Sequence, residues 1–159
     1  MLGLLNALPL ERYNNRNYII ANTDITSEKK AKAAQIVPMN TKFYTIPRSR
    51  EVGQSYIIAI WMTIYAFFVS LRLVYQLKPS LLLVNGPGTC LPVCLSIAVL
   101  RYLCLVKTKI IFVESVCRVK KLSMTGIILY KFRIADKIMV QWSELATKYP
   151  RTTYVGILL

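Results

Sequence analysis

The sequence predicts an α/β fold: a Rossmann-like parallel sheet with helices on both faces. Two observations carry this prediction. Short apolar runs alternate with longer helical segments along the whole chain, and the apolar runs are continuous instead of alternating with polar residues. Continuous apolar runs are typical of strands buried on both faces, as in parallel sheets whose crossovers are helices. We expect residues 1–159 to form a single domain, because a chain of this length buries roughly two-thirds of its unfolded surface in one core.

The strands are predicted where apolar runs stop at turn-forming residues. The run from Tyr18 to Ala21 ends at an Asn-Thr-Asp turn, and the run that ends at Asn85 meets Gly-Pro-Gly. Runs rich in β-branched and aromatic residues, such as KFYTI and KIIFV, also favour strands. The predicted strands cover residues 18–21, 42–46, 80–85, 109–114, 137–141 and 152–155.

The helices are predicted between these strands. The amino end, MLGLLNAL, is too short and lacks the basic residues of a secretion signal, so it indicates part of an amphipathic helix. Because a doubly wound half usually begins with a strand and a glycine turn ahead of that helix, we expect the sheet to lack its first strand. The other predicted helices cover residues 29–35, 51–76, 91–103 and 122–132.

Composition limits both the chemistry and the partners. The chain has 21 Lys plus Arg against 7 Asp plus Glu, a formal charge of +14, and 55% hydrophobic residues. An apolar and basic chain is suited to a membrane surface. Histidine is absent, which excludes His-ligated zinc and Ser-His-Asp or Cys-His catalysis from within this chain. We expect no metal, no cofactor and no catalytic residue.

The basic residues are scattered, with no run of five, and no RNA-binding motif accompanies them, so we expect no nucleic-acid partner. A solvated basic face and attraction to anionic lipid both stay open for these charges. The four cysteines form no C-x-x-C pair, which indicates reduced thiols in a cytosol-facing protein that act as small core residues. They are Cys90, Cys94, Cys104 and Cys117.

The segment between Glu51 and Arg72 contains 20 residues without a formal charge. As a helix it would be about 30 Å long, just enough to cross a bilayer. Three interpretations stay open: a helix against the cytosolic membrane face, an ordinary buried helix, or a full span. Small or polar residues form one stripe that would approach the rest of the domain, namely Ser55, Ala59, Thr63, Ala66 and Ser70. Within residues 56–71, the expected membrane contacts are Tyr56, Ile57, Ile60, Trp61, Ile64, Phe68 and Leu71.

In doubly wound folds, ligands bind beyond the carboxyl ends of the strands. Five such places follow apolar runs here: Asn22-Thr23, Pro47-Arg48, residues 85–89, residues 114–118 and Gln141-Trp142. The glycines of the 85–89 segment allow backbone amides to approach an anion ahead of a helix, although such a turn is also a common tight connection. At the next strand end, the carboxylate of Glu114 could accept hydrogen bonds from sugar hydroxyls and Arg118 could bind phosphate. Alternatively, Glu114 caps the next helix or pairs with Arg118.

Five segments together resemble one family. This combination is similar to the membrane-anchoring subunit of the two-subunit UDP-N-acetylglucosamine transferase of asparagine-linked glycosylation, over nearly the whole chain. The segments are N-G-P-G-T-C at 85–90, F-V-E-S-V-C-R at 112–118, I-P-R-S-R-E-V-G-Q-S at 46–55, A-D-K-I-M-V-Q-W at 135–142 and the terminal Y-V-G-I-L-L.

The resemblance implies a split GT-B glycosyltransferase. This chain would be the acceptor-side half, inactive alone, and a separate soluble subunit would supply the donor-binding half. The joint enzyme would transfer N-acetylglucosamine to dolichyl-diphospho-N-acetylglucosamine on the cytosolic face of the endoplasmic reticulum, in the second step of lipid-linked oligosaccharide synthesis. The implied acceptor-binding residues are Gly86, Pro87, Gly88, Thr89, Glu114, Ser115 and Arg118. The implied partner-docking tail is Tyr154, Val155, Gly156, Ile157, Leu158 and Leu159.

Members of this family carry an amino-terminal membrane anchor, a strand and a Gly-Gly-His-Thr turn ahead of the first helix. Because this sequence contains none of them, we expect an amino-terminally truncated form whose membrane attachment depends on residues 56–71 and the basic surface. A different class of function also stays open. In that alternative, the chain is a basic, membrane-peripheral scaffold that binds a partner protein without touching sugar.

Overall fold

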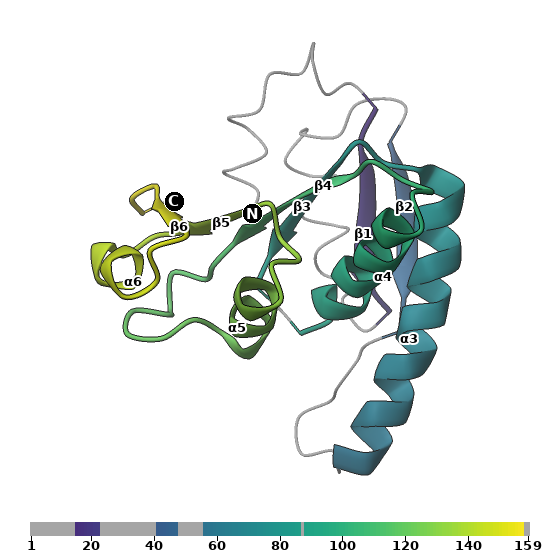
Figure 1. Ribbon diagram of the computed structural model, residues 1–159. Helices are drawn as coiled ribbons and strands as arrows, with labels where there is room; N and C mark the ends of the chain where they lie inside the picture. The colour runs from purple at the N-terminus through teal and green to yellow at the C-terminus, as the bar shows by residue number, and fades with distance from the viewer. Residues whose placement is uncertain (1–14, 23–40, 48–55, 87, 158–159) are drawn as a thin grey trace. The chain divides into compact units, whose positions relative to one another are not determined.

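The computed structural model describes residues 15–22, 41–47, 56–86 and 88–157 (Figure 1). The chain divides into two compact bodies, with the boundary after Arg48. The first contains two strands, and the second contains the remaining helices and strands. Each body is described by itself, and the single domain expected over residues 1–159 stays a prediction.

In the first body, β1 (Asn17–Ala21) and β2 (Lys42–Ile46) pair in parallel along their whole length. The rings of Tyr18 and Phe43, which are neighbours in this register, stack with their centroids 5.3 Å apart. Both strands were predicted to within one residue. The helices expected at the amino end and at residues 29–35 lie outside the described residues.

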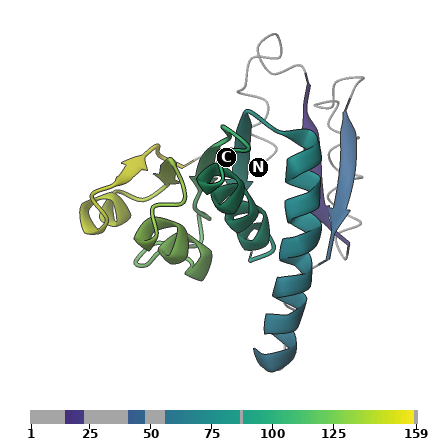
Figure 2. The same ribbon diagram turned by 45° about the vertical axis from the view of Figure 1, so that its right-hand side comes forward.

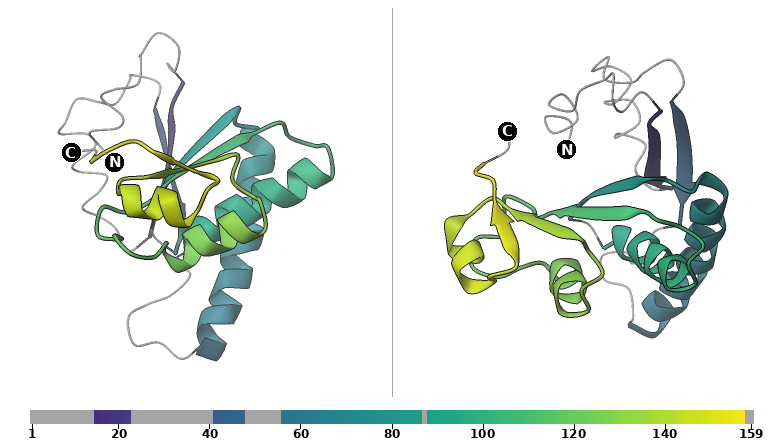
Figure 3. Two further views of the ribbon diagram at one scale, coloured as in Figure 1. Left: turned by 60° about the vertical axis from the view of Figure 1, so that its left-hand side comes forward. Right: turned by 45° about the horizontal axis from the view of Figure 1, so that its top comes forward.

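The second body is built on a parallel sheet with the strand order β3-β4-β5-β6. Because all neighbours are parallel, the carboxyl ends of the strands meet at one edge of this sheet (Figure 3). Both ends of each strand lie within one residue of the predicted positions. The strands are β3 (Leu81–Asn85), β4 (Lys109–Val113), β5 (Lys137–Val140) and β6 (Thr152–Tyr154).

Two helices cover one face of this sheet. Figure 3 shows α4 (Cys90–Tyr102) and α5 (Met124–Lys131) against the same face. Val84, Phe112 and Ile138 are register partners on neighbouring strands, and each is at most 4% exposed. This row of apolar side chains forms the centre of the core, as expected for a parallel sheet covered by helices.

The helix α3 (Tyr56–Leu77) packs beside α4 (Figure 2). Ala66 and Ser70 of the predicted small-residue stripe are completely buried, which confirms close approach at these two positions. The Ser96 hydroxyl lies 3.1 Å from the carbonyl oxygen of Phe67 on α3. Small side chains at a helix contact allow the two helix backbones to come near each other. The opposite, exposed side of α3 has no packing partner in the described chain.

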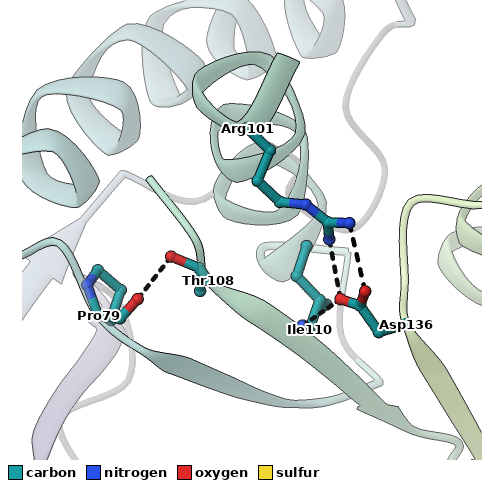
Figure 4. A network of polar contacts seen from close by, with 5 residues as sticks. All are labelled: Pro79, Arg101, Thr108, Ile110 and Asp136. Atoms are coloured by element: carbon teal, nitrogen blue, oxygen red, sulfur yellow. Dashed lines mark hydrogen bonds and ion pairs between the residues drawn. The ribbon is translucent and has the colours of Figure 1, made fainter. Parts of the chain in front are cut away.

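A polar network ties the opposite edge of the sheet, where the strands begin (Figure 4). Arg101 at the end of α4 forms two hydrogen bonds with the carboxylate of Asp136, at 2.8 and 3.2 Å. One oxygen of that carboxylate also accepts the backbone N–H of Ile110 at 2.7 Å, and the Thr108 hydroxyl donates to the carbonyl of Pro79. These polar groups are hydrogen-bonded to one another, so this edge of the sheet has a structural role.

Two predictions about the second body were incomplete. The short helix α6 (Ser143–Lys148) was not predicted, because its sequence SELATK is too short and too polar to show helical periodicity. Cys104 and Cys117 were expected in the core but are exposed. Cys104 follows α4 in a left-handed backbone conformation, and Cys117 lies in the loop after β4, so neither is on the buried side of an element.

Candidate functional site

Three loops meet where β3, β4 and β5 end. Asn85 pairs with Val113 in the β3–β4 register, so the residues that follow these strands are neighbours. A Cβ atom built on Gly86 would lie 3.7 Å from the Cβ atom of Ser115. The structure therefore brings together the two loops that the sequence predicts for acceptor binding, as parallel strand ends require.

The loop after β3 leads directly into α4. Gly86 has a φ of +60°, the left-handed region that favours glycine. Gly88 is exposed, and a Cβ atom there would meet nothing within 4 Å. Thr89 is the N-cap residue of α4 but makes no side-chain capping bond. A helix start of this kind offers backbone N–H groups to an anion. Pro87 lies outside the described residues.

Glu114 is completely buried beside this edge. One carboxylate oxygen accepts the backbone N–H of Ser115 at 2.9 Å, and the other accepts that of Ser123 at 2.8 Å. Ser123 is the N-cap residue of α5, and its hydroxyl accepts the N–H of Gly126 at 3.0 Å. The arrangement matches the capping alternative. Both oxygens are enclosed and accept backbone N–H groups, and contact of this carboxylate with sugar hydroxyls stays a prediction.

Arg118 is exposed at this edge of the sheet, whereas Glu114 is buried. Its backbone N–H donates to the carbonyl of Ser115 at 3.0 Å, and the N–H of Cys117 approaches the Ser115 hydroxyl at 3.4 Å. This turn leaves the Arg118 side chain exposed, and within the described ranges no carboxylate pairs with it. A guanidinium carries planar donors that match two phosphate oxygens, so this turn can present a cation to a phosphate-containing ligand.

The loop after β5 contributes two contacts that sequence reasoning missed. The side-chain amide of Gln141 donates to the carbonyl of Glu114 at 2.9 Å. The indole N–H of Trp142 donates to the carbonyl of Val116 at 2.7 Å. The position of both residues at a strand end was visible in the sequence, but which loop they contact depends on the β4–β5 pairing.

The thiols near the site differ in their environments. Burial raises the pKa of Cys90 to about 11. Burial, followed by the effect of the neighbouring Cys90, raises the pKa of Cys94 above that of Cys90. Cys117 is exposed within the loop after β4. The thiols of the partly exposed Cys90 and the buried Cys94 therefore remain neutral at ordinary pH, whereas Cys117 offers an accessible sulfur next to Arg118 in the sequence.

The side of α3 that faces away from α4 carries large apolar side chains in water. We define the α3 apolar face as Ile60, Trp61, Ile64 and Phe68, which are 60%, 69%, 42% and 61% exposed. The Ile60–Leu77 window is long and apolar enough to cross a membrane, and 17% of it is buried. Leu71 is half-buried, while the side chains of Tyr56 and Ile57 lie outside the described residues.

The predicted docking tail continues from the outer strand of the sheet. The backbone N–H of Val155 donates to the carbonyl of Val140, which extends the β5–β6 pairing by one bond. Tyr154 and Ile157 are about half exposed. Leu158 and Leu159 lie outside the described residues. The described part of the tail thus presents apolar side chains beside a free strand edge.

Comparison with solved structures identifies a similar fold. The chain is similar to MurG of Acinetobacter baumannii, with a TM-score of 0.60 and 18% sequence identity over 90% of this chain and 37% of that protein. An identity this low shows the fold alone. It agrees with the predicted α/β class and with the GT-B half that the motifs implied.

Comparison with sequences identifies the family. A family model described as "Oligosaccharide biosynthesis protein Alg14 like" matches residues 1–158. The human UDP-N-acetylglucosamine transferase subunit ALG14 is 42% identical, over 98% of this chain and 75% of the human protein. The subunit of the same name from Yarrowia lipolytica is 40% identical, over 100% of this chain and 74% of that protein. Together with the strand-end loops, these matches show that the chain belongs to the Alg14-like family of oligosaccharide biosynthesis proteins.

Proposed function

We propose that this chain is the acceptor-binding and membrane-recruiting subunit of a two-subunit UDP-N-acetylglucosamine transferase, and that it is inactive alone. The proposal is supported by the names of its human and Yarrowia lipolytica relatives, which are subunits of such a transferase. The proposed partner is a soluble, donor-binding glycosyltransferase subunit. The proposed acceptor is dolichyl-diphospho-N-acetylglucosamine, used in the second step of lipid-linked oligosaccharide synthesis.

The observation that carries this proposal is the exposed side chain of Arg118, which pairs with no carboxylate in the described residues and belongs to the loop whose Ser115 lies beside Gly86. A diphosphate needs cationic and N–H donors, and this edge of the sheet offers both. Glu114 acts here by holding the loop, while the other residues would face the ligand. The proposed acceptor contacts are Gly86, Pro87, Gly88, Thr89, Ser115 and Arg118.

The α3 apolar face supports membrane recruitment. The four large apolar side chains of this face are costly to leave in water. One of them, Trp61, is a residue type that favours the interface between lipid and water. The surplus of basic residues adds attraction to anionic lipid. We place the chain against the cytosolic face of the endoplasmic reticulum membrane, with contacts extending over residues 56–71. The tail from Tyr154 to Leu159 is the proposed docking site for the soluble subunit.

The test uses the chain co-expressed with the soluble subunit. Arg118→Ala removes the guanidinium and leaves the loop backbone unchanged. Binding of a short-chain prenyl diphospho-N-acetylglucosamine to the purified complex is measured by calorimetry. Loss of charge-assisted hydrogen bonds predicts binding that is about ten- to a hundredfold weaker. Lys131→Ala, which removes an exposed cation from the end of α5, is the matched control and should bind as the parent chain does.

The same measurement separates this function from the scaffold alternative. A scaffold that never touches sugar would keep its partner, and Arg118→Ala would leave both partner binding and transfer unchanged. If the complex with the parent chain shows no affinity for the diphosphosugar, acceptor binding is excluded and the scaffold function is supported.

A further inference from the structure

We propose that Gln141 and Trp142 are positioning residues for the acceptor. They act through the loop after β4, whose conformation presents Arg118 to the diphosphate. The inference rests on the proposed function, because it assigns a role in binding the same ligand. It adds two residues from the loop after β5, neither of which would touch the acceptor itself.

The first support is the geometry of the two hydrogen bonds. The Gln141 amide donates to the carbonyl of Glu114 at 2.9 Å, and the Trp142 indole donates to the carbonyl of Val116 at 2.7 Å. These carbonyls lie on either side of Ser115, so the two donors hold the loop at both ends of its first turn. Gln141 is 7% exposed, and the contact is therefore shielded from competing water.

The second support is that local structure does not explain a tryptophan at position 142. This residue is the N-cap of α6, where Ser, Thr, Asp and Asn are preferred because their side chains bond to free N–H groups. Trp142 makes no capping bond, so α6 lacks the stabilisation that a preferred N-cap residue would give it. What the side chain provides instead is the long-range bond to Val116.

The third support is that other backbone groups of the loop also have hydrogen-bond partners. The Glu114 carboxylate binds the N–H groups of Ser115 and Ser123, and the turn closes through the bond from the Arg118 N–H to the Ser115 carbonyl. With the Gln141 and Trp142 bonds added, the backbone from 114 to 118 is bonded at nearly every residue. Only the Arg118 side chain then needs to be ordered on binding.

A preformed loop matters because a ligand that must order its site binds less tightly by the cost of that ordering. Removing one neutral hydrogen bond from the loop costs about 0.5–1.5 kcal/mol, which corresponds to roughly two- to tenfold in affinity. The loss should appear only while Arg118 is present, because the loop acts by placing that side chain. A double-mutant cycle measures this dependence directly.

The experiment compares four complexes with the soluble subunit. These carry the parent chain, Trp142→Phe, Arg118→Ala, or both substitutions. Phenylalanine keeps most of the aromatic volume and removes the N–H donor. Binding of a short-chain prenyl diphospho-N-acetylglucosamine should weaken two- to tenfold with Trp142→Phe, and more with Arg118→Ala. The double variant should bind no more weakly than Arg118→Ala alone.

Controls keep each outcome interpretable. Thr147→Ala removes a side-chain hydrogen bond within α6 that does not reach the loop, and it should leave affinity unchanged. If Trp142→Phe does not fold, Gln141→Met tests the bond to Glu114 in the same cycle. The positioning role is overturned if Trp142→Phe binds like the parent, or if its effect simply adds to that of Arg118→Ala. If Arg118→Ala itself has no effect, the proposed acceptor site fails instead, so the two failures are distinguishable.

Discussion

Gly126 and Glu114 approach each other so closely that no side chain fits between them. A Cβ atom at Gly126 would lie 2.7 Å from one carboxylate oxygen of Glu114. It would also lie 3.2 Å from the Ser123 hydroxyl oxygen and 3.3 Å from the ring of Phe112. The first turn of α5 can therefore come near a buried anion. The carboxylate accepts the backbone N–H of Ser123, the N-cap residue of this helix, at 2.8 Å.

Replacement of this glycine should destabilise the fold. Gly126→Ala forces a methyl group against a buried carboxylate that cannot leave its backbone donors, and overpacking of this kind costs about 1–3 kcal/mol. Urea denaturation of the purified chain measures the change in free energy of unfolding. Gly88→Ala is the matched control, because a Cβ there meets nothing within 4 Å, and it should shift stability by less than about 0.5 kcal/mol. Equal losses would contradict the assigned contact.

The four thiols should react in two classes. Cys104 and Cys117 are exposed and should be labelled by a maleimide within minutes at pH 8. Burial raises the pKa of Cys90 to about 11 and that of Cys94 further, so at this pH both thiols are neutral, and Cys94 is also enclosed. Because a raised pKa reduces the thiolate fraction at any given pH, these two should react only after unfolding. Mass spectrometry of peptides with and without urea measures both classes.

Cys117 also reports on the acceptor site. It lies next to Arg118, so a bound diphosphosugar should slow its labelling. Cys104, which follows α4 at the other edge of the sheet, serves as an internal control whose rate should not change. Labelling rates with increasing acceptor analogue give the comparison. Equal protection of both thiols, or of neither, argues against acceptor binding at this loop.

The α3 apolar face should govern binding to lipid. The double substitution Trp61→Gln and Phe68→Gln removes two side chains that are 69% and 61% exposed. Burying such side chains in an interface is worth more than 1.4 kcal/mol in total, so binding to anionic vesicles should fall by at least about tenfold. Co-sedimentation measures this loss. Met124→Gln removes an exposed apolar side chain from α5, and it should leave vesicle binding intact.

The tail should be required for the partner. Deletion of the last three residues, Ile157 to Leu159, removes an apolar end that follows the outer strand. The soluble subunit should then no longer co-purify with the chain, while the thermal transition of the chain should stay in place because Val155 keeps its bond to Val140. Undiminished co-purification would show that the partner docks elsewhere.

The sequence alone was sufficient for elements whose signal is local. Continuous apolar runs placed the strands to within a residue, because burial on both faces of a parallel sheet demands such runs. The small residues at Ala66 and Ser70 correctly indicated the packed side of α3. The helix α6 was not predicted, since six mostly polar residues show no periodicity. The exposure of Cys104 and Cys117 was also missed, because it depends on where the turns of the chain lie.

What the sequence determined by itself is the α/β class, the order of its elements, the strand-end loops and, through its motifs, the family. The tertiary structure decided what each loop residue does. Glu114 could equally have met a ligand or capped a helix, because a carboxylate suits both. Only the tertiary approach of Ser123 and Gly126, nine and twelve positions further along the chain, gave this carboxylate its backbone partner and its enclosure. Contacts between loops depend on strand pairing, and no local pattern encodes which loops become neighbours.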